Sequence, residues 1–259
     1  MTVFPLPLVA VCGLVLAMGA AAAPLSPVAV SGSVFFNLEP PPRVDFLTFG
    51  VFPLAGPGGS LQFSATSGPS PQLLAEVNTN TGYYGRSVGT LSYYLQIVGP
   101  AGDVPVSLSM QGKALGNSIT GSRFASFAVG MLWWLHNETT ATPLIAREGI
   151  ESGAIAGPYD QDFDPLYLLL LRAGDIYKVT LQVGAEAAAG SGASANASAR
   201  LRPLFQLDAG PEYSLLFSDG IGNAATPEPA ALGLMSLGLG LAYLRRNSNS
   251  RVGASSGRK

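Results

Sequence analysis

The sequence has almost no histidine or cysteine and few charged side chains. Its 259 residues include one His, one Cys, 14 basic and 16 acidic residues. This excludes a zinc site built from four cysteines, or from two cysteines and two histidines, and it excludes an intramolecular disulfide. The charged fraction of 12% is about half of the usual share. The net charge of -2 gives no electrostatic reason to expect a nucleic-acid partner.

The scarcity of histidine also limits the catalytic mechanisms that the chain could support. His136 is the single imidazole and follows the aromatic pair Trp133-Trp134 at the end of a predicted strand. A Ser-His-Asp triad would need this histidine and an activated serine. We expect no Gly-X-Ser-X-Gly nucleophile elbow to supply that serine. The sequence therefore predicts a protein without enzymatic activity.

Residues 1–23 have the features of a secretory signal peptide. A compact apolar run, Val9–Met18, precedes four alanines and then Pro24. Small residues at Ala21 and Ala23 match the Ala-X-Ala pattern of a cleavage site. The apolar run is shorter than the roughly 20 residues that a membrane-spanning helix needs. We expect a signal helix that is removed on export; the alternative is a buried helix of the folded domain.

Residues 226–259 contain three features in a fixed order. The motif Pro227-Glu228-Pro229 comes first, the uncharged segment Ala230–Leu244 follows, and Arg245 with Arg246 closes it. Fifteen residues rise about 22 Å as a helix, which is less than the roughly 30 Å hydrocarbon core. Such a span still inserts where the bilayer thins around it. The Arg pair predicts that the C-terminal end of this short transmembrane helix is cytoplasmic.

This C-terminal end resembles the PEP-CTERM sorting signal of Gram-negative bacteria that make exopolysaccharide. The resemblance rests on the Pro-Glu-Pro motif, the short apolar span and the Arg pair. It implies that an exosortase, a membrane cysteine protease, cuts near the motif. Two features depart from the family pattern: Thr226 stands where Val is commoner, and the tail runs thirteen residues past Arg246. The alternative is an ordinary C-terminal anchor that is never cut.

The body between these ends, residues 24–225, alternates apolar and polar residues with a period of two, which is typical of strands with one buried face. Gly/Pro/Asp clusters separate the alternating runs. We therefore predict an all-β body, a β-sandwich or a jelly roll. The alternating runs are 91–97, 104–110, 127–133, 177–183, 193–201 and 213–217. Two segments leave alternatives: 164–172 is a helical turn or, as we prefer, a buried strand, and 184–199 is an alanine-faced strand or a flexible linker.

Three alternate acidic residues, Asp160, Asp162 and Asp164, form the only concentrated acidic motif. Their spacing matches positions 1, 3 and 5 of an EF-hand loop. Pro165 and Leu171 stand where an EF-hand requires Gly and Glu, so that motif is excluded. A looser Ca²⁺ site in an extracellular loop, a solvated acidic loop and a glycosidase carboxylate pair all stay open.

Adjacent aromatic pairs occur at three places in the body: Tyr83-Tyr84, Tyr93-Tyr94 and Trp133-Trp134. Neighbours on a strand face opposite ways, so one member of each pair can enter the core. The outward members would then stack on sugar rings or cover a second packed surface.

These features together favour an exported, non-enzymatic surface or extracellular-matrix protein of an exopolysaccharide-producing bacterium. Its expected partners are the exosortase, the inner membrane before processing, and the exopolysaccharide. No cofactor is expected, apart from the open question of Ca²⁺. The alternative is a secreted carbohydrate-binding or carbohydrate-active β-sandwich, which an aromatic strip on one sheet face would favour.

Overall fold

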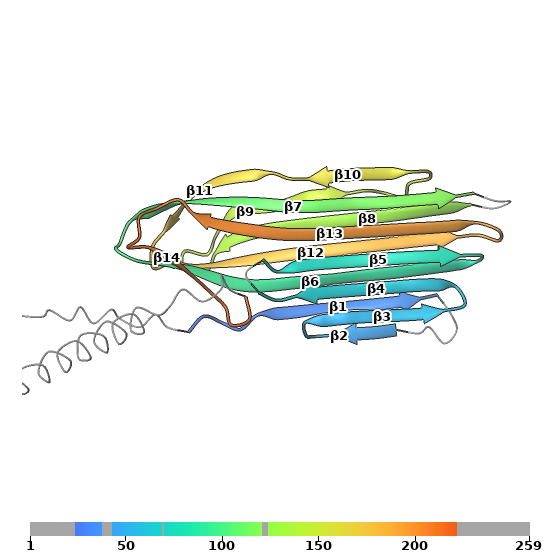
Figure 1. The fold of residues 1–259 in the computed structure, drawn as a ribbon, viewed down its shortest axis with the longest axis horizontal. Helices are drawn as coiled ribbons and strands as arrows, with labels where there is room; N and C mark the ends of the chain where they lie inside the picture. The colour runs from blue at the N-terminus through green and yellow to red at the C-terminus, as the bar shows by residue number, and fades with distance from the viewer. Residues whose placement is uncertain (1–23, 38–42, 69, 121–123, 222–259) are drawn as a thin grey trace, which may run out of the picture.

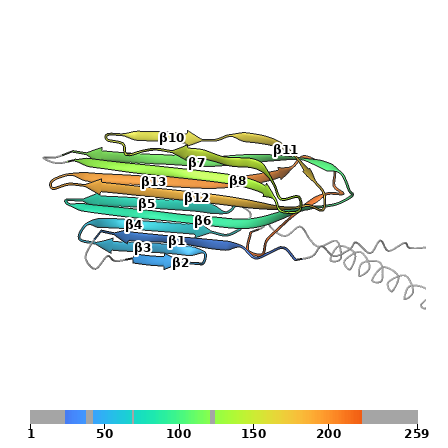
Figure 2. The same ribbon diagram turned by 180° about the vertical axis from the view of Figure 1, so that it is seen from behind.

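The computed structural model describes residues 24–37, 43–68, 70–120 and 124–221, and these form two antiparallel β-sheets that pack face to face (Figures 1 and 2). The described residues contain no helix. The prediction of an all-β sandwich is confirmed. Within the described part of the chain, no helix is long and apolar enough to cross a membrane.

Sheet A has the strand order β2-β1-β6-β12-β8-β9, and β14 also pairs with β6. Its strands are β1 (Ala29–Phe36), β2 (Arg43–Phe46), β6 (Tyr83–Val98), β8 (Ala125–Asn137), β9 (Thr142–Glu151), β12 (Ile176–Ala189) and β14 (Ser214–Phe217). Sheet B has the order β10-β7-β13-β5-β4-β3, and β11 also pairs with β7. Its strands are β3 (Gly50–Gly56), β4 (Gly59–Thr66), β5 (Gln72–Asn80), β7 (Asp103–Ile119), β10 (Tyr159–Phe163), β11 (Leu166–Arg172) and β13 (Ser194–Leu207).

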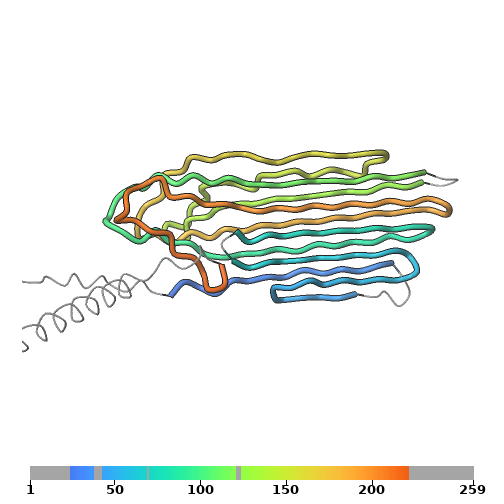
Figure 3. Tube along the Cα trace, viewed as in Figure 1, coloured from blue at the N-terminus to red at the C-terminus, as the bar shows by residue number. Residues whose placement is uncertain are grey.

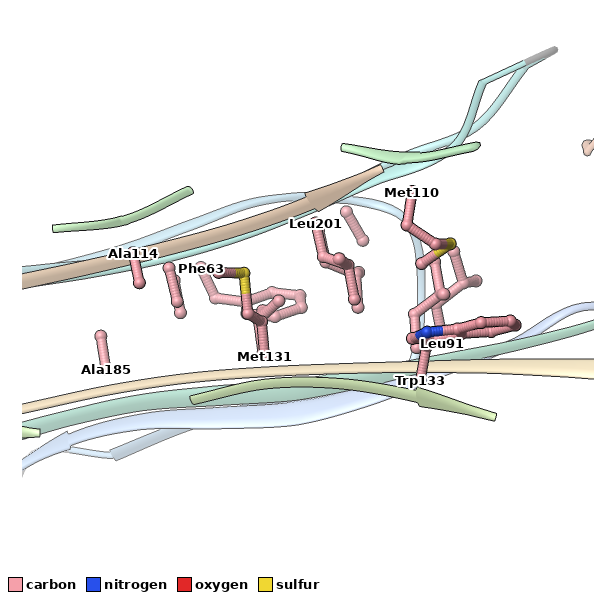
Figure 4. Close-up of a cluster of buried hydrophobic side chains, with 14 of the residues drawn as sticks. Phe63, Leu91, Met110, Ala114, Met131, Trp133, Ala185 and Leu201 are labelled. Carbon is pink, nitrogen blue, oxygen red and sulfur yellow. The ribbon is translucent and has the colours of Figure 1, made fainter. Parts of the chain in front are cut away.

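The core lies between the sheets and is built from the alternating runs. All five runs from 91 to 201 form strands that bury the predicted apolar face, and the run 213–217 forms the half-buried β14. Figure 4 shows Leu91, Met131 and Trp133 of sheet A pointing toward Leu201 and Met110 of sheet B. The alanine-rich segment is not a linker, because Ala195, Ala197 and Ala199 are buried in β13.

Small and large side chains are matched across the core. A Cβ atom added at Gly116 would lie 2.1 Å from the ring of Phe127, and one added at Gly89 would lie 2.2 Å from the ring of Phe63. Real Cβ atoms do not approach so closely, so glycine is required at both positions for packing. In both contacts an aromatic ring of one sheet lies directly over a glycine of the other sheet. These contacts therefore fix how the two sheets pack against each other.

Segment 164–172 differs from its prediction in one respect. It forms a strand, β11, as preferred, but only one face is covered. Leu166, Leu168 and Leu170 are 65%, 79% and 71% exposed. These side chains lie on the outer face of sheet B, which no described strand covers. In addition, β11 is an edge strand that pairs only with β7, so a neighbouring strand shields it on one side only (Figure 1).

The first and last described segments meet at one end of the elongated sandwich (Figure 3). The hydroxyl of Ser218 donates to the carbonyl of Ser26 at 2.7 Å and accepts the N–H of Tyr94 at 2.9 Å. The turns that join β5 to β6 and β12 to β13 lie at the opposite end. Both ends of the described body therefore leave from the same side, far from these turns.

Candidate functional site

The acidic motif is part of a strand, so the expected loop is wrong. Asp160 and Asp162 lie in β10, which pairs with β7, and both side chains are exposed. The Nζ of Lys113 lies 2.9 Å from Asp162 Oδ1 and also contacts Asp160. Hydrogen bonds to the two carboxylates raise the pKa of Lys113 above its ordinary value. Asp164 follows the strand and is outside this ion-paired cluster.

In this arrangement a lysine ammonium occupies the position between the two carboxylates. A period of two places Asp160 and Asp162 on one face, and the ammonium of Lys113 supplies the positive charge there. No cluster of three or more His, Cys, Asp or Glu side chains suited to a metal ion occurs within the described residues.

Among the described residues, the imidazole of His136 makes one polar side-chain contact, and that contact is local. Its Nδ1 lies 3.2 Å from Oε1 of Glu138, two residues along the chain. In the described segments no serine hydroxyl is hydrogen-bonded to it. In the part of the chain that the structure describes, a nucleophile, a base and an acid are therefore not assembled around this imidazole.

The Gly-X-Ser-X-Gly pattern does occur in the chain, at Gly85-Arg86-Ser87-Val88-Gly89, so its expected absence is wrong. The segment lies inside the long strand β6 and makes no strand-to-helix turn, which a nucleophile elbow requires. Ser87 is fully buried, and its hydroxyl donates to the carbonyl of Gln62 at 2.7 Å. The match is therefore structural: the serine satisfies a backbone carbonyl in the core.

Two of the three aromatic pairs divide between the faces as predicted. Tyr93 and Trp133 are buried in the core. Tyr94 and Trp134 are half-buried on the outer face of sheet A, where the ammonium of Lys178 lies 6.0 Å from the ring centre of Tyr94. Sheet A therefore presents aromatic surface to the solvent, in contrast to the outer face of β13, which is largely polar.

A shallow groove lies on the outer face of sheet A, over β6, β8 and β12. Its volume is about 360 Å³. The floor contains Gly130 of β8 and Gly184 of β12, which are direct cross-strand neighbours. A Cβ added at either glycine would meet no atom closer than 3.7 Å. Packing therefore does not require these two glycines, unlike Gly116, and their effect is to keep the floor open.

Charged groups form one wall of the groove. Nε of Arg86 lies 2.8 Å from Oε1 of Glu186, and the hydroxyl of Tyr84 donates to Oε2 of the same carboxylate at 3.0 Å. Burial, followed by the charge of Glu186, raises the pKa of Tyr84 to about 12, so this hydroxyl keeps its proton at neutral pH. The wall is therefore polar and almost neutral.

The rest of the groove adds polar and apolar groups side by side. Gln182 and Leu132 are cross-strand neighbours in its lining, and Trp134 stands one row further along the same face of β8. Glu151 lines the far end, and Arg147 neutralises it at 2.7 Å. A lining of paired charges and an amide, with an aromatic ring nearby, suits a neutral polyhydroxylated ligand better than an anion.

The sequence carries a signal for this groove. Gly130 and Gly184 interrupt strongly alternating strands, and glycine inside a strand often marks a close approach of a ligand or of another backbone. The two residues are 54 positions apart, so their pairing could not be read from the chain alone.

Comparisons with known proteins give little support for any function. No protein-family model matches the chain, and no curated protein matches it. Among solved structures, it is similar to TmCBM61 in complex with β-1,4-galactotriose, at 12% identity and a TM-score of 0.17, over 74% of this chain and 90% of that one. It is also similar to a chain of the T13 infectious bursal disease virus particle, at 10% identity and a TM-score of 0.18, over 82% of this chain and 65% of that one. Likenesses this low carry no argument about function.

Proposed function

We propose that this chain is an exported, non-enzymatic surface or matrix protein that an exosortase processes at its C-terminal end. The observation that carries the proposal is the order of the Pro-Glu-Pro motif, the apolar span 230–244 and the Arg pair Arg245-Arg246. All of these residues, and the signal segment with Ala21 and Ala23, lie outside the described residues. This proposal therefore rests on the sequence.

The arrangement of the body supports this proposal. Ser26 and Ser218 are hydrogen-bonded, so the segments that lead to the two processed ends leave from one end of the sandwich. A body attached there would stand away from the membrane, with the β5–β6 and β12–β13 turns farthest out. Both faces of the sandwich would then be open to the surroundings.

Processing is the direct test. We expect the exported protein to lose both apolar ends and to have the mass of approximately residues 24–228, because the signal peptide is removed and the exosortase cuts near Glu228. Intact-mass spectrometry of protein from the cell surface and the medium measures this. The control is the same chain in cells without exosortase, which should retain 230–244. A surface protein that keeps this span in exosortase-positive cells would contradict the proposal.

The groove on sheet A favours a second candidate function, the binding of a neutral carbohydrate. Gly130 and Gly184 leave the backbone open at the floor, and Gln182 with the Arg86–Glu186 pair lines the groove. The Tyr84 hydroxyl is bonded to Glu186, and Trp134 stands one row beyond Leu132 on the same face. This is the combination of polar groups and aromatic surface that sugar rings require.

A larger side chain at the floor of the groove tests carbohydrate binding without disturbing the fold. Gly184→Val adds a side chain where the nearest atom to a Cβ is 3.7 Å away. We expect stability to stay the same or to rise by roughly 0.5–1 kcal/mol, since valine suits a strand better than glycine. Retention in affinity gels containing neutral polysaccharides should be lost. Ala55→Val, on the exposed β3, is the matched control and should bind normally. Equal retention of Gly184→Val would exclude the groove as the binding site.

A further inference from the structure

The strand at the exposed edge of sheet B, β11, has an apolar outward face. Leu166, Leu168 and Leu170 point outward from β11, and no charged residue lies between Asp164 and Arg172. The pairing of β11 with β7 runs without interruption from Leu166 to Arg172. Natural edge strands are usually protected by a charge, a proline or a bulge within the strand, because an open edge is a template for pairing. The stretch from Leu166 to Leu171 has none of the three.

The backbone of β11 is also free to pair. The carbonyl of Pro165 accepts the N–H of Met110 on β7 at 3.0 Å. Alternate residues of an antiparallel strand direct their backbone groups to opposite sides. The N–H and C=O groups of Leu166, Leu168 and Leu170 therefore face the open edge. The open stretch stops at Arg172, because its N–H donates to the hydroxyl of Tyr177 at 2.7 Å and its carbonyl accepts from the same hydroxyl at 3.2 Å.

We infer that β11 pairs with β11 of a second copy of this chain, antiparallel and with the two-fold axis at Leu168. In this register Leu168 lies opposite Leu168 of the second copy, and Leu166 lies opposite Leu170. Asp164 then faces Arg172 at both ends of the ladder. The result is one continuous sheet made from two B sheets.

Charge complementarity makes a second copy the partner. The outward residues of the segment read Asp164, Leu166, Leu168, Leu170 and Arg172, a series that is complementary to itself when reversed. Within one copy, neither Asp164 nor Arg172 belongs to an ion pair among the described residues. Opposite charges placed directly across a ladder stabilise it, and like charges destabilise it. A two-fold contact uses the same patch on both copies, as this pattern requires.

A single introduced cysteine tests the register. Cys12 is the only cysteine of the chain, so Cys12→Ser with Leu168→Cys leaves one thiol. Directly paired residues of a hydrogen-bonded antiparallel pair have Cα atoms about 5.5 Å apart, which is within disulfide range. We expect mild oxidation of the full chain in detergent micelles to give mainly covalent dimer. Val51→Cys, 59% exposed on β3 at the other edge of sheet B, is the control and should stay monomeric. Equal cross-linking of the two variants would overturn the inference.

Charge reversal tests the partner independently. Asp164→Arg and Arg172→Asp each create two like-charge pairs in the dimer, so each alone should raise its dissociation constant about tenfold. The double variant restores both pairs and should restore the affinity. Sedimentation of the full chain in micelles measures this, and the result does not depend on whether an exosortase cuts the chain. If the single variants leave the dissociation constant unchanged, or the double variant does not restore it, the contact lies elsewhere or involves the chain's own apolar span.

Discussion

Trp133→Ala should lower the free energy of unfolding by about 3–5 kcal/mol, because transfer free energy is lost and a cavity remains. Trp133 is fully buried between the sheets (Figure 4). The centre of its ring lies 4.9 Å from the centre of the Tyr167 ring in an edge-on contact. A loss of this size is a large part of the total stability of an ordinary domain.

The neighbouring residue supplies the matched control. Trp134 has the same side chain on the same strand, but it points to the outer face of sheet A. Trp134→Ala should cost roughly 1 kcal/mol or less, the usual range for a substitution outside the core. Urea unfolding of both variants, followed by far-UV circular dichroism, measures the difference. Equal losses would mean that β8 is shifted by one residue, which would exchange its two faces.

Stability should also fall steeply above pH 10, because four tyrosines hold their protons more tightly in the folded state. Burial raises the pKa of Tyr93 and of Tyr177 above the ordinary value. Burial, together with a nearby carboxylate, raises the pKa of Tyr84 and of Tyr167 to about 12. The carboxylates are Glu186 and Glu148, respectively.

The direction in which the free energy of unfolding changes with pH follows from proton linkage. Below pH 10 both states keep these protons, and the stabilisation is fully present. Above pH 10 the unfolded chain loses them first, so the free energy of unfolding falls until the pH passes the folded-state pKa values, near 12 for Tyr84 and Tyr167. Tyr93 by itself contributes a slope of about 1.4 kcal/mol per pH unit.

Urea unfolding at a series of pH values from 8 to about 11.5 measures this slope. Tyr93→Phe keeps the buried ring but removes the ionisable group, so its slope should be shallower than that of the unchanged protein. A free energy of unfolding that stays constant through this range would contradict the inferred burial of the phenols.

The strands themselves could be predicted from the sequence because alternation is a local property. In 127–133 and 177–183 every second residue is apolar, and the structure buries each of these in the core, while Leu132 and Thr180 are buried as well on the other face. The same rule predicts that Trp133 and Trp134 point to opposite faces of the sheet, since neighbours on a strand face opposite ways. The scarcity of His and Cys likewise limited the chemistry of the chain before any fold was known.

Only the tertiary structure decided which strands lie side by side. Consecutive strands cross between the sheets, β6 in A, β7 in B and β8 in A, and alternation is the same in either sheet. Three features depend on segments that are far apart in the chain. They are the contact of Lys113 with Asp160 and Asp162, the pairing of Gly130 with Gly184, and the position of β11 at the edge beside β7. Period-two alternation determines which face of a strand is apolar, but long-range register and edge position depend on how the sheets assemble. The acidic strand, the groove and the self-complementary edge are consequences of that assembly.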